Sequence, residues 1–284
     1  MKVIFNNLLQ INITTFHELF LIENYKDILL LDISDSELTS IPDEFFIFIN
    51  LKILIANNNN LKKLSKNLIK LINLEVLILN FNKFDVIPQE IFNLKNLKIL
   101  SLNKNEIKII PKEISQLINL IKFSISFNKI NQLSKELGYL ENLEELNMKG
   151  NFISSLPKTI VQLINLKTLI LCDNYIEFIP KNIYYLENLE ELFMNNNKIN
   201  NLSKDMYKLE KIKKLCFNNN NIKNIPKTFN KLTNIDFIAL IGNQIENAHE
   251  IITNKLILDN SDILKISATY ELKSILEKYN INLT

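Results

Sequence analysis

The side chains most often used for nucleophilic, metal-binding or redox chemistry are few here: two cysteines and two histidines. Cys172 and Cys216 are far apart in the chain, and His17 and His249 lie near its opposite ends. A zinc site needs ligands at short, regular spacings, and a cysteine nucleophile needs a histidine beside it. The sequence shows neither arrangement, so we expect no catalytic residue, no metal site and two free thiols in a reducing compartment.

The sequence also contains no motif for phosphate binding. Gly138, Gly150 and Gly242 are too dispersed for a phosphate-binding loop or a dinucleotide fingerprint. The 33 basic residues are all lysine, so the chain has no arginine finger and no bidentate reader of phosphate or bases. A net charge of +2 adds no bulk attraction for a polyanion. These features predict a protein that is not an enzyme, has no cofactor and binds no nucleic acid.

What the chain has in abundance is a repeat. Leucine recurs every 23 residues from Leu51 to Leu189, and the same step gives Ile28 before them and Ile212 and Ile235 after them. This makes ten units in phase, without an insertion or deletion. One such unit cannot bury its apolar side alone, whereas stacked units build a continuous core.

Each unit reads L-x-x-L-x-L-x-x-N-x-I and then x-x-I-P-x-x-I-x-x-L-x-N. In the fourth unit Leu100 and Leu102 are two residues apart, which places both on one face of a strand. Pro111 opens the return segment, where Ile114 and Leu117 have the spacing of a short helical or 3-10 turn. The proline position holds serine in every third unit, at Ser65, Ser134 and Ser203, which indicates growth by duplication of a triplet.

An asparagine stands at one position of nine units, from Asn59 to Asn243. Its amide has both donors and acceptors for backbone groups where a strand bends into the return segment. We therefore expect a structural ladder rather than a ligand site, with Ser36 in its place in the first unit.

These units resemble the leucine-rich-repeat family, in the 23-residue form common in intracellular scaffold proteins such as those of the Ras-suppressor type. The resemblance implies an α/β solenoid: a horseshoe with a parallel β-sheet on its concave face and short helical or 3-10 segments on its convex face. It further implies an N-terminal cap over 1–27, ten repeats over 28–245, and a C-terminal cap with a terminal helix over 246–284.

The two ends fit this organisation. Thr15 and Glu18 form a capping box ahead of a short amphipathic helix, and an apolar stripe near the C-terminus, including Leu272 and Tyr279, is spaced to cover the last strand. Asparagines interrupt the first apolar stretch, so we expect no signal peptide, and no apolar run is long enough to span a membrane. We expect a cytoplasmic protein that is monomeric on its own.

The concave face is the remaining candidate for binding. Strand positions that do not point into the core are apolar in units two to four, and a contiguous exposed apolar patch indicates a partner site. The predicted partner-binding patch contains Ile53, Ile55, Val76, Ile78, Phe81, Ile99 and Phe127. A secondary patch contains Phe152, Ile170, Tyr175 and Phe193.

The resulting hypothesis is a protein–protein interaction scaffold, with a role in intracellular signalling and a partner that the sequence does not identify. Two alternatives stay open: a regulatory subunit in a phosphatase or small GTPase pathway, and a secreted or surface effector of a pathogen or symbiont. A detached recognition half of a larger enzyme is a further alternative, although some forty residues after Ile245 are too few for a catalytic domain.

Overall fold

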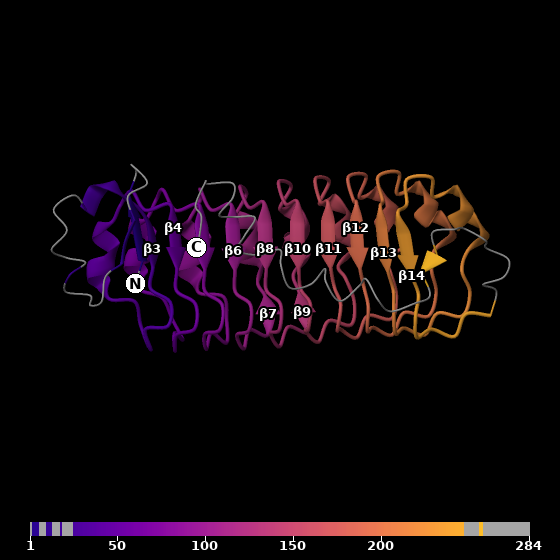
Figure 1. Ribbon diagram of the computed structural model, residues 1–284, viewed down its shortest axis with the longest axis horizontal. Helices are drawn as coiled ribbons and strands as arrows, with labels where there is room; N and C mark the ends of the chain where they lie inside the picture. Colours follow the sequence, from indigo (N-terminus) through magenta and orange to yellow (C-terminus); the bar gives the residue numbers. More distant parts are fainter. Residues whose placement is uncertain (1, 6–9, 13–17, 19–24, 247–255, 258–284) are drawn as a thin grey trace.

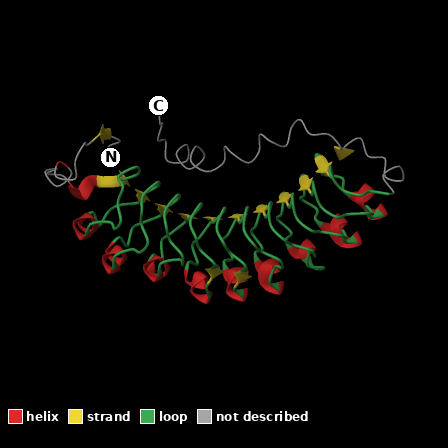
Figure 2. Ribbon diagram, turned by 90° about the horizontal axis from the view of Figure 1, so that it is seen from below, coloured by secondary structure: helices red, strands yellow, loops and turns green. Residues whose placement is uncertain are grey.

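The computed structural model describes residues 2–5, 10–12, 18, 25–246 and 256–257. Their strands lie side by side along the chain, and the molecule curves into an arc with strands on its concave side and short helices on its convex side (Figures 1 and 2). Ten parallel strands recur at the 23-residue step of the sequence and pair in chain order. They are β3 (Ile28–Asp32), β4 (Ile53–Ile55), β5 (Val76–Ile78), β6 (Ile99–Ser101), β8 (Lys122–Ser124), β10 (Glu145–Asn147), β11 (Thr168–Ile170), β12 (Glu191–Phe193), β13 (Lys214–Cys216) and β14 (Phe237–Ala239).

The alternation within each strand separates core from concave surface. In β6 the middle residue, Leu100, packs in the main core, while Ile99 and Ser101 face the other side of the sheet. The same side chains repeat one strand away, because Leu77 of β5 pairs with Leu100 in register. The core is therefore one continuous column along the arc, as the repeat predicts.

Short 3-10 helices fill the convex side, one in each unit after the concave-face strand, from the unit of β3 to that of β13. They are η2 (Asp43–Ile47), η3 (Lys66–Lys70), η4 (Gln89–Asn93), η5 (Lys112–Gln116), η6 (Lys135–Tyr139), η7 (Lys158–Gln162), η8 (Ile183–Tyr185), η9 (Lys204–Lys208) and η10 (Lys227–Lys231), with η1 (Tyr25–Asp27) ahead of β3. On this side β7 (Ile109–Ile110) and β9 (Gln132–Leu133) also pair in parallel.

The structure gives the alternation of proline and serine a physical basis. Except at η8, both residues are N-caps rather than first helical residues, with extended backbones whose φ lies between −56° and −80°. Proline reaches this φ through its ring. Serine instead accepts a hydrogen bond: the Ser65 hydroxyl from the backbone N–H of Asn67, and the Ser203 hydroxyl from that of Asp205. Proline and serine therefore stabilise the same N-cap backbone conformation in two different ways.

At the N-terminal end the sheet continues with two strands that the repeat does not predict. β1 (Lys2–Phe5) pairs antiparallel with β3 on one side and with β2 (Gln10–Asn12) on the other. At the other end β15 (Leu256–Ile257) pairs in parallel with β14. The helices expected in the two caps, and both histidines, lie outside the described residues apart from Glu18, so the cap boundaries stay a prediction.

Candidate functional site

The asparagine column has the structural role expected of it. The Asn128 amide oxygen accepts the backbone N–H of Ile107 at 3.0 Å, and its amide nitrogen donates to the carbonyls of Leu102 at 2.9 Å and Ile125 at 3.1 Å. The same bonds recur from Asn59 to Asn243, and nearly all of these amides are buried. This column links neighbouring units and is not available to a ligand.

A second asparagine ladder is formed by the last residue of the repeat pattern. It was not predicted from the sequence. Here an exposed amide donates to a carbonyl of the preceding unit, as from Asn119 to Lys95 at 2.8 Å and from Asn142 to Ile118 at 2.8 Å. Lys211 takes this position in one unit and bonds the Asn188 amide oxygen at 2.6 Å. This ladder too serves the stacking of units.

Both cysteines are free and buried: Cys216 ends β13, and Cys172 lies two residues after the end of β11. Burial raises the pKa of the Cys172 thiol to about 11 and that of Cys216 to about 12. Within the described chain, no three His, Cys, Asp or Glu side chains are grouped to hold a metal ion. The thiols are therefore packing residues in this fold.

We expect both thiols to resist alkylation while the chain is folded. The thiolate is the reacting form, and a pKa of about 11 leaves roughly one thiol in a thousand ionised at pH 8. Mass spectrometry after iodoacetamide treatment should find both unmodified in buffer and both modified in 6 M guanidinium. Rapid modification of the native protein at pH 8 would contradict the burial.

Most of the concave patch is not exposed, and on this point the sequence-based prediction is wrong. Ile53, Ile55, Val76, Ile78 and Ile99 form a second buried cluster with Leu30 and Ile4, and each is at most 7% exposed. Their strands pair in register, so each aliphatic side chain stands beside those of its neighbours. Inward curvature crowds the side chains on this face, and β1 adds Ile4 beyond Leu30. These residues are thus part of the folded interior.

The secondary patch divides in the same way. Phe193 is buried with Cys172, Cys216 and Ala239, and Ile170 is only partly buried against them. Phe152 and Tyr175, by contrast, are close to half exposed, and their rings stack with centroids 6.0 Å apart. Exposure was therefore predicted correctly for the two residues beyond the strand and incorrectly for Phe193 within it.

The exposed aromatic residues of both patches lie where the chain leaves the strands. Phe81 and Phe127 are 49% and 45% exposed, at the eighth position of their units, and Phe152 and Tyr175 are at the tenth position of later units. A backbone hydrogen bond holds the eighth position of one unit against the next unit, as from the Phe81 N–H to the Asn103 carbonyl at 2.9 Å. We call the side chains of Phe81, Lys104, Phe127, Phe152 and Tyr175 the aromatic rim.

The backbone of this eighth position is left-handed in all ten units. Such a conformation suits glycine, asparagine and aspartate, and it strains a bulky side chain. Seven units have one of these three residue types at the eighth position. The other three have a bulky side chain there: Phe81 has φ 54°, Lys104 φ 52° and Phe127 φ 52°. These three bulky residues occur in consecutive units. The fold does not require them there, because the other seven units have glycine, asparagine or aspartate at this position.

Of these three side chains, Lys104 lies beside both phenylalanines. The Lys104 ammonium nitrogen lies 4.4 Å from the ring centroid of Phe81 and 5.7 Å from that of Phe127. Lys149 lies 5.6 Å from the Phe127 ring and pairs with Asp173 at 3.5 Å. Gly150 has no side chain to obstruct that ring: a Cβ there would stand 2.6 Å from a ring carbon of Phe127.

Charges elsewhere on the sheet neutralise each other across strands. Lys98 pairs with Glu75 at 2.6 Å, and Lys214 with Glu191 at 2.7 Å. Lys167 with Glu144 is a further example at 2.9 Å. Exposed pairs of this kind contribute about 0–1 kcal/mol each and set the register rather than attract a polyanion.

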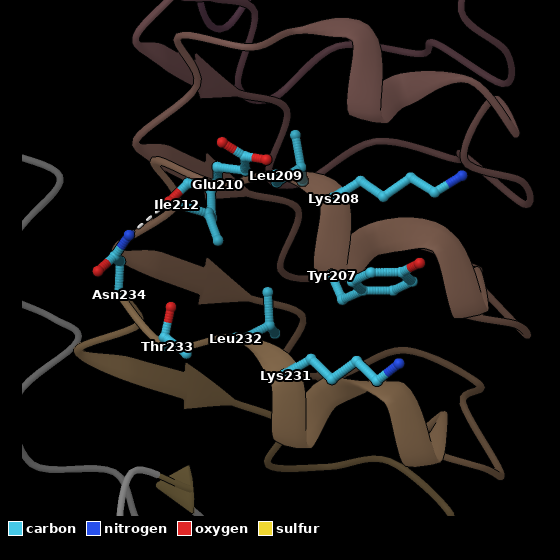
Figure 3. Close-up of a pocket in the computed structure, with 9 residues that line it drawn as sticks. All are labelled: Tyr207, Lys208, Leu209, Glu210, Ile212, Lys231, Leu232, Thr233 and Asn234. Atoms are coloured by element: carbon cyan, nitrogen blue, oxygen red, sulfur yellow. Dashed lines mark hydrogen bonds between the residues drawn. The ribbon is translucent and has the colours of Figure 1, made fainter.

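A groove on the convex side lies between η9 and η10, where Lys208 and Lys231 extend past the Tyr207 ring (Figure 3). At its edge the Asn234 amide bonds the Glu210 carbonyl at 2.7 Å. Lys208 pairs with Asp205 of its own helix. The groove is the ordinary gap between two stacked units and brings together no catalytic groups.

Comparison with known proteins agrees with this geometry. The leucine-rich-repeat family model matches residues 72–130 and 164–215. A leucine-rich-repeat protein of Leptospira interrogans is 36% identical, with a TM-score of 0.76, over 78% of this chain and 56% of that one. The chain thus spans little more than half the length of this relative. No curated protein sequence matches it.

Two more distant structures share the fold. An internalin of Listeria monocytogenes is 21% identical with a TM-score of 0.59, over 82% of this chain and 78% of that one. The Arabidopsis receptor kinase HAESA, solved in complex with the peptide hormone IDA and a co-receptor, is 22% identical with a TM-score of 0.61, over 78% and 43%. In the described part of this chain no helix is long and apolar enough to cross a membrane. Ten in-register units, the asparagine ladder and these similarities identify the chain as a leucine-rich-repeat protein with the horseshoe fold of that family.

Proposed function

We propose that this protein is a binding scaffold that holds another protein against the aromatic rim of its concave side. The observation that carries the proposal is the gathering of half-exposed aromatic side chains at one edge of the sheet in units three to seven. Aromatic residues are enriched at protein interfaces, and contiguous exposed apolar groups mark them. Leucine-rich-repeat proteins generally mediate protein–protein interaction, and the HAESA structure contains a peptide hormone.

The binding surface proposed here is narrower than the sequence-based one. Phe81 and Phe127 stay within it, Phe152 and Tyr175 extend it, and the buried aliphatic cluster is left out. We place the protein in the cytoplasm, where two free buried thiols are stable, and take it to be monomeric without its partner. A signalling role, a regulatory role for an enzyme and an effector role differ in the partner, which the following experiment identifies.

The whole chain and its double variant Phe81→Asn/Phe127→Asn serve as baits in a cell lysate, with bound proteins quantified by mass spectrometry. Asparagine occupies the same left-handed position at Asn58, Asn196 and Asn219, so the variant keeps a backbone that the fold already uses. Relief of strain and loss of ring contacts oppose each other, so its stability should stay within about 1 kcal/mol of the parent protein.

The expected result is a protein enriched on the parent bait and lost from the double variant. Ile118→Asn is the matched control, because Ile118 is 58% exposed and lies four residues ahead of β8, whereas the rim residues follow the strands. This control should retain the partner. Equal enrichment on the parent and the double variant would contradict the proposed surface.

A further inference from the structure

The three central residues of the rim have a more specific geometry than an apolar patch. Lys104 stands between two phenyl rings, one unit from each, with its ammonium 4.4 and 5.7 Å from their centroids. Neighbouring strands are about 4.8 Å apart, so the two rings flank the ammonium over roughly 10 Å. This is the span of about three residues of extended chain.

The ammonium of Lys104 has no ion-pair partner among the described residues. Lys149, the other lysine beside the Phe127 ring, has one in Asp173. Lys104 is exposed, and the rings beside it exclude water from part of its surroundings, which strengthens any charge that pairs with it. The free charge of the rim is therefore positive and lies between two apolar surfaces.

Folding alone does not explain these residue types. The eighth position is left-handed throughout, and seven of its ten residues are asparagine, aspartate or glycine. Strained side chains of this kind persist where they have a use. The Phe127 ring packs against Gly150, where a side chain would collide with it, which indicates that the ring has a defined position.

We infer that Phe81, Lys104 and Phe127 bind an acidic segment of the partner, in which a glutamate or aspartate carboxylate pairs with Lys104 while apolar side chains within two residues of it pack on the two rings. The inference rests on the proposed function and names the chemistry of its ligand. A protein segment fits better than single-stranded nucleic acid, because the pairs Lys129–Glu106 and Lys149–Asp173 leave no continuous basic track for phosphates.

The test uses a phage-displayed library of random twelve-residue peptides, selected on the whole chain. We expect enrichment of peptides that carry an acidic residue with apolar residues within two positions on both sides. Selection on Lys104→Glu should instead enrich peptides with a basic residue at that place. The same acidic motif emerging from the parent and from Lys104→Glu would overturn the inference.

The most enriched peptide is then titrated against the parent protein and three variants by fluorescence anisotropy. We expect at least tenfold weaker binding for Lys104→Gln and for Phe81→Asn/Phe127→Asn, and unchanged binding for Lys158→Gln, which removes the same charge from the exposed surface of η7. Equal losses for Lys104→Gln and Lys158→Gln would show bulk electrostatics and overturn the site.

Two outcomes separate the inference from the proposal beneath it. If the double phenylalanine variant loses the cellular partner while Lys104→Gln and Lys104→Glu both retain it, the scaffold role stands and the acidic ligand is wrong. If a labelled twelve-nucleotide single-stranded RNA binds more tightly than the selected peptide and the double variant abolishes that binding, the rim is a nucleic-acid site and both are wrong.

Discussion

Replacement of Ile78 by aspartate is expected to destabilise the fold by about 3–5 kcal/mol, because it puts an unpaired carboxylate into a buried apolar cluster. Ile78 is 2% exposed and stands beside Ile55 of the preceding strand. Urea denaturation followed by circular dichroism measures the loss. Such a change in a repeat array also separates the stability of its two halves, so the transition should broaden as well as shift.

Ile78→Val is the matched control. It keeps the side chain apolar and removes one methylene, so a loss of about 0.5–1.5 kcal/mol is expected. A variant Ile78→Asp with the parent's denaturation midpoint would show that this face is open to water. In that case the aliphatic residues from Ile53 to Ile99 would again be candidates for direct contact with a partner.

The second large effect is expected from Asn128→Leu, which removes the ladder from the middle of the array. The change leaves the buried N–H of Ile107 without its acceptor, whereas the Leu102 carbonyl keeps its bond from the Asn105 amide at 3.0 Å. An unsatisfied buried donor costs about 1–3 kcal/mol, so a loss of about 1–3 kcal/mol follows. The thermal midpoint of the parent and the variant is the measurement.

The exposed ladder supplies the control for this prediction. Asn119→Ala removes one exposed bond to the Lys95 carbonyl, which water can replace, so the loss should stay below about 1 kcal/mol. Equal losses for Asn128→Leu and Asn119→Ala would contradict the claim that burial makes the first ladder essential.

The arc itself was predictable from the sequence for a physical reason. A 23-residue unit repeated in phase leaves one way to bury Leu77, Leu100 and Phe123 together, namely parallel stacking of the units. The asparagine ladder followed from the donors and acceptors of its amide. The N-terminal strands did not, because Lys2–Phe5 is a single short segment whose partner, β3, is the first strand of the array.

The binding surface was predicted only in part. Alternation along a strand shows which side chains point away from the main core. It does not show that Val76 and Ile78 would be buried in a second cluster on the opposite face of the sheet. The better signal was the eighth column, where Phe81, Lys104 and Phe127 replace the asparagine, aspartate and glycine of the other units. The residue types alone do not reveal the left-handed backbone of this column, which is what makes a phenylalanine or lysine unusual there.

The central claim is that a protein partner binds at the aromatic rim, and isothermal titration calorimetry of the purified partner tests it most directly. Truncation of two interface aromatic residues should cost about 1.4 kcal/mol or more each, which is at least about a hundredfold in affinity for Phe81→Asn/Phe127→Asn. Ile118→Asn should bind as the parent does. Equal affinity of the parent and the double variant, with binding weakened by Ile118→Asn instead, would place the partner elsewhere on the horseshoe and contradict the claim.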